Sequence, residues 1–221
     1  MILSAADEAS PQAQKALDQL CCLYWRPLFV YCCGLGHSKA NAEDLTQGYF
    51  AQIMARGALR FADPERGKFR TFLLSSFKNY LTDVHRKGGA EKRGGGAVHV
   101  SFEMDVTDPS LLCVSAEAGP ERAFDQQWAQ DVVRRATEGL RREYADIGKG
   151  EWFELVAGDQ AGPNYQALAE RFGSTEDAIK SFALRVRKRF RALLEREIAD
   201  TVSTPEEIPS EMAYLAELLR N

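Results

Sequence analysis

The sequence predicts an all-α protein: two helical domains joined by a flexible linker, the C-terminal one a helix-turn-helix domain. Three observations lead to this fold class. Apolar residues recur at three- and four-residue steps along most of the chain, which is the period of helices packed on one side. A glycine-rich stretch at 88–96 interrupts that pattern. Near the C-terminus, two helical runs meet at Gly173, and glycine takes the left-handed end conformation of a helix without steric cost.

The composition narrows the classes of function. The chain has 221 residues, 45% of them hydrophobic, and a net charge of −4. We find no apolar run of about 18 residues and no signal peptide, so we expect a cytoplasmic protein without a membrane span. Positive charge is concentrated at 86–93 and 185–191. This predicts DNA contact that is assisted by a partner, or no DNA contact at all.

The cysteines and histidines give no sign of chemistry. The five cysteines fit a reducing compartment, and the adjacent pairs Cys21–Cys22 and Cys32–Cys33 lack the ligand spacing of zinc sites. We therefore expect small buried side chains there, no metal and no cofactor. The three histidines are scattered and no nucleophile is paired with a base, so we expect no enzyme.

Residues 1–87 form the predicted first domain. A helix at 13–35 is apolar on most sides and should be largely buried, with Pro27 interrupting or bending it. The next helix, 39–56, carries Asp44, Gln47 and Gly48 opposite its core stripe. The gap at Gly48 would let a partner helix approach closely. The alternative is a plain polar surface with an incidental glycine.

A third helix is predicted at 68–86 after a turn-rich loop. Its core stripe is strongly aromatic, and polar and basic residues lie outside it. Amides and arginine beside aromatic rings suit the binding of unpaired bases, although a solvated surface is the plainer interpretation. The outer residues are Lys78, Asn79, Thr82, Asp83 and Arg86.

Residues 88–119 form the predicted linker, glycine-rich at first and then alternating between apolar and polar residues. The second domain, 120–202, begins with helices at about 120–145 and 149–157. A tail follows at 203–221. We expect Ser210 to cap its last helix. The tail from Thr204 either covers the helix-turn-helix or packs on its back, and we expect packing.

The stretch 164–198 organises the second domain. Asn164 is the expected N-cap of a helix at 165–172, and Ser174 or Thr175 caps a longer helix after the turn. One side of the longer helix is apolar and the other is basic. In a helix-turn-helix protein the basic side lies along the major groove, whereas on an ordinary helix it is simply solvated. The basic side comprises Lys180, Ser181, Arg185, Arg187, Lys188, Arg189 and Arg191.

Several of these segments, in this order, resemble bacterial RNA polymerase sigma factors of the extracytoplasmic-function (ECF) type. The similarity covers about residues 17–202. The matching segments are AEDLTQ at 42–47 with Phe50, DPERGKFR at 63–70, Asn79 and Asp83, KRGGG at 92–96, YQALA at 165–169, and AIKS at 178–181 with Arg185 and Arg187.

The resemblance implies a transcription initiation factor that binds core RNA polymerase and recognises and melts promoter DNA. The clamp of the largest subunit and the flap of the second are the implied docking sites, and the free protein is expected to be a monomer. The residues implied to contact the clamp are Asp44, Gln47, Gly48 and Ala51. The residues implied to bind the minus-ten element are Arg66, Lys68, Arg70, Lys78, Asn79, Thr82 and Arg86. The residues implied to bind the minus-thirty-five element are Thr175, Asp177, Lys180, Ser181, Leu184, Arg185, Arg187 and Lys188.

Four positions depart from the family pattern. Gly48 stands where the family has Glu, Phe72 where it has Trp, Phe182 where it has Arg, and Leu184 where it has His. Phe182 falls on the apolar stripe and is expected in the core, whereas Gly48 and Leu184 keep other functions open. Leu184 can contact a thymine methyl group or can mark a loss of DNA recognition. The alternatives are a sigma mimic that binds an anti-sigma protein and a stand-alone helix-turn-helix regulator. An anti-sigma protein is also a candidate partner of a true sigma factor.

Overall fold

A computed structural model describes residues 11–56, 68–90, 119–158, 163–202 and 204–220. All regular elements in these ranges are helices, which confirms the all-α prediction for the described part. The described residues fall into two compact units. Unit 1 contains the chain up to Gln130 together with residues from Ala199 onward, and unit 2 contains Asp131–Ile198.

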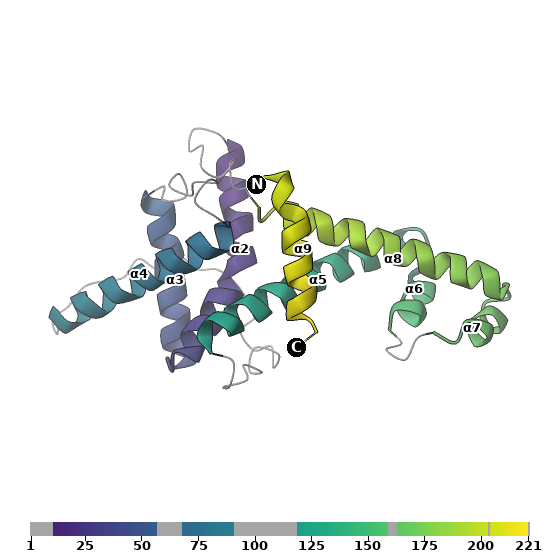
Figure 1. Cartoon of the computed structure of the whole chain (residues 1–221), viewed down its shortest axis with the longest axis horizontal. Coiled ribbons are helices and arrows are strands. Elements are labelled where there is room, and N and C mark those ends of the chain that lie inside the picture. Colours follow the sequence, from purple (N-terminus) through teal and green to yellow (C-terminus); the bar gives the residue numbers. More distant parts are fainter. Residues whose placement is uncertain (1–10, 57–67, 91–118, 159–162, 203, 221) are drawn as a thin grey trace. The chain divides into compact units, whose positions relative to one another are not determined.

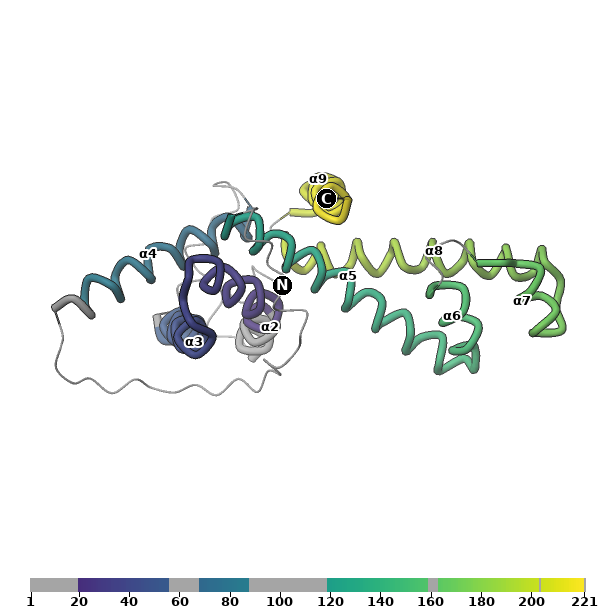
Figure 2. The backbone as a smooth tube through the Cα atoms, turned by 90° about the horizontal axis from the view of Figure 1, so that it is seen from below, coloured from purple at the N-terminus to yellow at the C-terminus, as the bar shows by residue number. Residues whose placement is uncertain are grey.

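Unit 1 is built on α2 (Pro11–Gly34) and α3 (Lys39–Arg56), which lie side by side (Figure 1). Figure 2 looks nearly along α3 and shows α4 (Phe69–Ala90) lying across this pair. The first part of α5 (Pro120–Asp146), the 3-10 turn η4 (Pro205–Glu207) and α9 (Ile208–Leu218) complete the unit. Large aromatic side chains fill the core, among them Tyr24, Trp25, Phe29, Tyr49, Phe77, Phe124 and Trp128.

Helix α2 runs through Pro27 without a break, so the predicted interruption is wrong. Residues 27–32 are all buried. Packing on nearly every side stabilises the helix and offsets the hydrogen bond that proline removes, because tertiary contacts routinely override local preference. The expectation of a largely buried helix is confirmed.

Helix α4 continues to Ala90, three residues into the predicted linker. The rest of that segment, 91–118, lies outside the described residues. Helix α5 begins at Pro120, as predicted, because proline is well suited to the first helical position.

The C-terminal helix does not lie where we expected it. Arg70 of α4 is hydrogen-bonded to Glu211 of α9, and Tyr214 of α9 donates to Asp125 of α5, so α9 packs within unit 1. Ser210 is also not the cap: it lies inside α9 and its hydroxyl donates to the carbonyl of Glu207 at 2.8 Å. The helix can begin before Ser210 because a proline in the first turn lacks only an N–H that would have no helical partner.

Unit 2 combines the remainder of α5 with α6 (Gly150–Ala157), α7 (Tyr165–Arg171) and α8 (Glu176–Ala199). Contacts between aromatic rings join these helices. The ring centres of Tyr144 and Phe153 are 5.7 Å apart in a stacked arrangement, and the ring centre of Trp152 lies 4.7 Å from that of Phe172 and 5.4 Å from that of Phe182. The apolar stripe of α8 is buried as predicted, with Ile179, Phe182 and Val186 at its centre. This core fixes the position of the α7–turn–α8 segment within the unit.

Candidate functional site

The predicted clamp residues lie together on α3. Asp44, Gln47, Gly48 and Ala51 follow steps of three and four residues, which brings them to one side of the helix. Asp44 is exposed and the other three are half-buried. Thr46 points the opposite way: it is fully buried and donates to the carbonyl of Ala42 at 2.7 Å. The helix therefore presents a carboxylate and an amide on the same exposed flank.

The structure explains why position 48 is a glycine, which the sequence alone did not show. A Cβ atom at this position would collide with the hydroxyl of Tyr80 on α4. The Tyr80 ring is held 5.5 Å from Tyr49 and 6.2 Å from Phe77, and burial raises its pKa. The close approach at Gly48 is therefore made by α4 of the same chain, where we had expected a partner helix.

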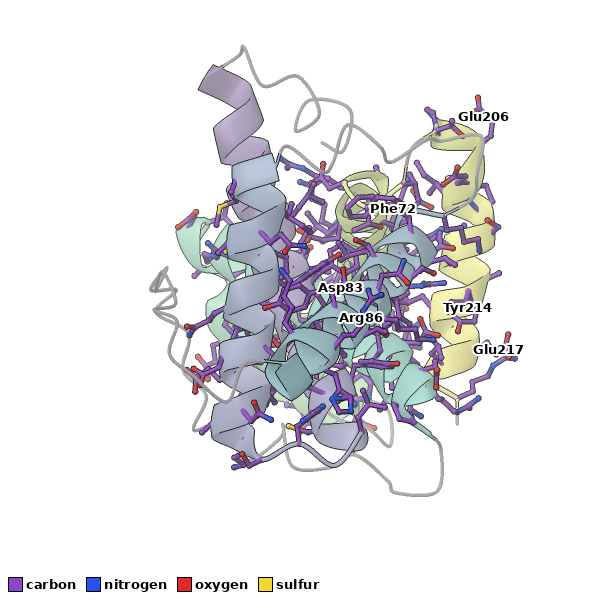
Figure 3. The ribbon with its side chains drawn as sticks, turned by 90° about the vertical axis from the view of Figure 1, so that its left-hand side faces the viewer. Phe72, Asp83, Arg86, Glu206, Tyr214 and Glu217 are labelled. Atoms are coloured by element: carbon purple, nitrogen blue, oxygen red, sulfur yellow. The ribbon has the colours of Figure 1, made fainter. Side chains whose placement is uncertain are left out.

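The outer side of α4 presents Asn79, Thr82 and Arg86, all of them exposed. The Thr82 hydroxyl donates to the carbonyl of Lys78 at 2.9 Å, and Arg86 pairs with Asp83. Figure 3 shows Asp83 and Arg86 on this side, with Phe72 nearer the start of the helix. These exposed side chains make the outer side of α4 polar.

Lys78 lies at the flank of this surface and is already engaged. Its ammonium group is 2.8 Å from Glu121 and 5.7 Å from the centre of the Tyr31 ring. The hydrogen bond to Glu121 raises the pKa of Lys78 and lowers that of Glu121. A nucleic-acid phosphate would have to displace this carboxylate to pair with Lys78.

Arg70, another predicted minus-ten residue, lies on the far side of α4. Nine residues separate it from Asn79, which is two and a half helical turns. Arg70 is only 7% exposed. Its guanidinium is 3.0 Å from Asp125 and 2.9 Å from Glu211. With α9 in this place Arg70 is covered, so the minus-ten contact that the resemblance implies for Arg70 would require α9 to leave.

Aromatic rings complete the surroundings of Arg70. Its guanidinium lies 4.5 Å from the centres of both the Trp128 and Tyr214 rings, and Lys68 Nζ is 2.5 Å from Glu211. We call this group the Arg70 cluster: Lys68, Arg70, Asp125, Trp128, Glu211 and Tyr214. Burial and the hydrogen bond to Asp125 raise the pKa of Tyr214 to about 12. Arg66, the remaining predicted minus-ten residue, lies outside the described residues.

In unit 2 the local signals around the turn between α7 and α8 are confirmed. The Asn164 side chain accepts a hydrogen bond from the amide of Ala167 at 3.1 Å. Gly173 has φ of +56°, the left-handed conformation that favours glycine. Of the two candidate caps of α8, Thr175 is the one that accepts, from the amide of Ala178 at 3.2 Å.

The outward side of α8 carries a row of exposed side chains, which we call the α8 row: Asp177, Lys180, Ser181, Leu184, Arg185 and Lys188. Leu184 lies in the middle of the row and is 66% exposed. Lys180 is paired with Glu176 at 2.7 Å. In the described part of the chain, Arg185 and Lys188 form no ion pair with another residue. Their charge is therefore available to an anionic ligand.

The other basic residues of α8 are held by contacts within the unit. Arg187 donates to the Tyr165 hydroxyl at 3.3 Å. Arg189 forms two hydrogen bonds of 2.7 Å with Glu143, and Arg191 pairs with Glu195 at 2.9 Å. The sequence suggested a uniformly basic face, but near both ends of that face the positive charges are paired with glutamates, and only the charges in its central part are not.

Two grooves lie beside these surfaces, one bordered by Thr82 of α4 and the other by Arg187 of α8. One in unit 2, about 430 Å³, is lined mainly by apolar residues that include Leu140, Phe153, Val186 and Phe190. One in unit 1, about 440 Å³, lies between Leu35, His37, Leu81 and His85.

Among the described residues, no three His, Cys, Asp or Glu side chains gather as a metal site would require. Within the same ranges, no helix combines the length and apolar character of a membrane span.

Comparison with known proteins gives no further guide: no family model, curated protein or solved structure matches this chain. The surfaces that bear on function are therefore the α3 flank, the outer side of α4, the Arg70 cluster and the α8 row.

Proposed function

We propose that this protein is a transcription initiation factor of the ECF sigma type, which binds core RNA polymerase and directs it to promoters. The observation that carries the proposal is that two compact units each present a different polar surface. Unit 1 presents the carboxylate and amide of Asp44 and Gln47 on α3, and unit 2 presents the α8 row behind a capped helix and a glycine turn. A stand-alone DNA-binding domain would not need the first of these surfaces.

Unit 2 is the proposed reader of the minus-thirty-five element. A recognition helix contacts base edges in the major groove while nearby basic side chains contact phosphates. Arg185 and Lys188, free of ion pairs with described residues, suit the phosphate contacts. Ser181 can hydrogen-bond a base edge, and the exposed Leu184 side chain suits apolar contact with a thymine methyl group.

Unit 1 is the proposed reader of the minus-ten element. Asn79 supplies an amide that can donate to and accept from a base edge, and Arg86 supplies positive charge from the same exposed side of α4. Unpaired bases can stack on exposed aromatic or guanidinium planes, which offsets the few kcal/mol that unstacking costs.

Core polymerase is the proposed partner because the chain has no net positive charge with which to hold DNA by itself. Its net charge is −4, and many of its arginines are paired within the protein. Nonspecific DNA binding depends on neutralised phosphates, so the free chain should bind DNA weakly. Docking on the polymerase through α3 would bring both DNA-binding surfaces to the promoter at high effective concentration.

Selection from a randomised DNA pool tests this proposal. Core polymerase with the protein should enrich a motif with two separated elements, and neither component alone should do so. Arg185→Ala/Lys188→Ala should lose the upstream element and keep the downstream one. Arg141→Ala/Arg142→Ala, which removes the same charge from α5 of the same unit, should keep both elements. Failure to enrich any motif with the polymerase present would refute the proposed function.

A further inference from the structure

The Arg70 cluster joins the C-terminal helix to two cations, Lys68 and Arg70, to which the resemblance to sigma factors gives a role in DNA binding. Lys68 and Arg70 approach each other at the start of α4, and the carboxylate of Glu211 lies between them at 2.5 and 2.9 Å. A carboxylate held by two cations in this way occupies the position that a phosphate oxygen would take, since both anions pair with Lys and Arg through charge-assisted hydrogen bonds.

Helix α9 is attached by a narrow surface. Its buried residues are Glu211, Leu215 and Leu218, so a charged side chain forms one third of the buried set. The desolvation of a buried ion pair offsets much of its attraction, and such a pair is weak evidence for a permanent contact. An 11-residue helix is also marginal by itself, so its order depends on staying docked.

The rest of the C-terminal segment is acidic. Residues 204–220 contain four glutamates and one arginine. Figure 3 shows Glu206 and Glu217 toward the two ends of this segment, which lies beside α4. A docked α9 therefore adds negative charge around Lys68 and Arg70, and like charge opposes the approach of DNA to these two cations.

We propose that α9 is a detachable, DNA-mimicking inhibitor: docked, Glu211 fills the anion site of Lys68 and Arg70, and released, it leaves that site to a phosphate of single-stranded promoter DNA. This inference rests on the proposed function. It also accounts for the burial of Arg70, whose contact with DNA then requires the departure of α9.

Release also changes how unit 2 is connected. The chain leaves unit 1 after Gln130 and returns to it at Ala199, so unit 2 is joined to unit 1 at both of its ends. Undocking of α9 removes part of the attachment at the C-terminal end. A factor that contacts two separated promoter elements needs this freedom, so polymerase or promoter binding would favour the released state.

The test uses the full chain with a charge reversal at the docked carboxylate. Glu211→Lys places a cation against Lys68 and Arg70 and should release α9. Glu206→Lys is the matched control, because it makes the same charge change on an exposed residue before the helix. Hydrogen exchange of the amides of 208–218 should be protected in the wild type and the control and accelerated in Glu211→Lys.

The second readout is binding of a fluorescent single-stranded DNA of randomised sequence to the free chain across a salt series. Two additional phosphate contacts should steepen the slope of log K against log salt by about 1.4 for Glu211→Lys relative to Glu206→Lys. Adding Lys68→Ala to Glu211→Lys should remove about half of that gain. Equal slopes for the two charge reversals, with α9 released, would overturn the proposal.

Two further outcomes are decisive. Amides of 208–218 that stay protected in Glu211→Lys would also overturn it, because docking would then not depend on the ion pair. Where Glu211→Lys fails to fold, Glu211→Gln against Glu206→Gln makes the same comparison with a smaller expected change. Co-elution of the wild-type chain with core polymerase is measured separately, so failure of this inference is distinguishable from failure of the proposed function.

Discussion

Removal of the Arg70 guanidinium should destabilise unit 1 more than removal of its partner on α9. Arg70→Ala deletes the cation shared by Asp125 and Glu211, and it also removes the contacts of Arg70 with Asp125 and the Trp128 ring, which remain when α9 separates. Breaking a buried ion pair by removing one partner costs about 3–5 kcal/mol. Since the Asp125 side chain keeps 22% exposure and regains water, we expect about 3 kcal/mol, at the low end of that range.

Glu211→Ala should cost less for a reason that lies in the fold. Arg70 keeps Asp125 and the Trp128 ring, and α9 can separate from the unit, so the loss is limited to the free energy of docking α9. We expect about 1.5 kcal/mol, the lower value for a hydrogen bond to a charged group.

Urea unfolding followed by tryptophan fluorescence measures both variants. A Trp152→Phe background restricts the signal to Trp25 and Trp128 of unit 1. Arg142→Ala, an exposed arginine of unit 2, serves as control and should change the free energy by less than about 0.5 kcal/mol. Equal losses for Arg70→Ala and Glu211→Ala, or a loss below about 1 kcal/mol for Arg70→Ala, would refute the account of the cluster.

Three more predictions concern single side chains. Gly173→Ala should destabilise unit 2 by about 1 kcal/mol, because alanine is strained at φ of +56°; an unchanged unfolding midpoint, followed through Trp152, would contradict this. The difference in tyrosinate absorbance between wild type and Tyr214→Phe should titrate near pH 12, and a midpoint at 10 would be inconsistent with a half-buried hydroxyl that donates to Asp125. Because this pKa is raised, the stability that the protonated hydroxyl contributes is complete below pH 10 and is lost as the pH rises toward about 12. Deoxyuridine in place of one thymine of the selected upstream element should weaken wild-type binding and leave Leu184→Ala unaffected, whereas equal losses in both would exclude a methyl contact.

Local signals in the sequence predicted the elements well. The boundaries of α3 agree at both ends, and the cap at Asn164 and the turn at Gly173 are present as expected. Each depends on residues within one or two turns of each other, so the sequence alone contains the relevant chemistry. The sequence could also have predicted that Arg70 and Asn79 lie on opposite sides of α4, because the nine residues between them make two and a half helical turns.

Long-range pairs account for what the sequence could not show. Arg70 and Glu211 are 141 residues apart, and the apolar side of α9 would fit any exposed apolar surface of similar size. The same holds for Gly48, whose role depends on Tyr80 from another helix. The pairing of Arg189 with Glu143 is likewise visible only once α5 and α8 are packed together.

The most direct test of the central claim is co-elution with bacterial core RNA polymerase in gel filtration. The wild-type chain should co-elute at micromolar concentration, and Asp44→Ala/Gln47→Ala should elute separately. Glu43→Ala/Gln52→Ala removes an acid and an amide that lie on α3 to either side of the predicted contact residues, and this variant should behave as the wild type. If the wild type does not co-elute, or if both double variants bind equally well, the proposed docking through α3 is wrong.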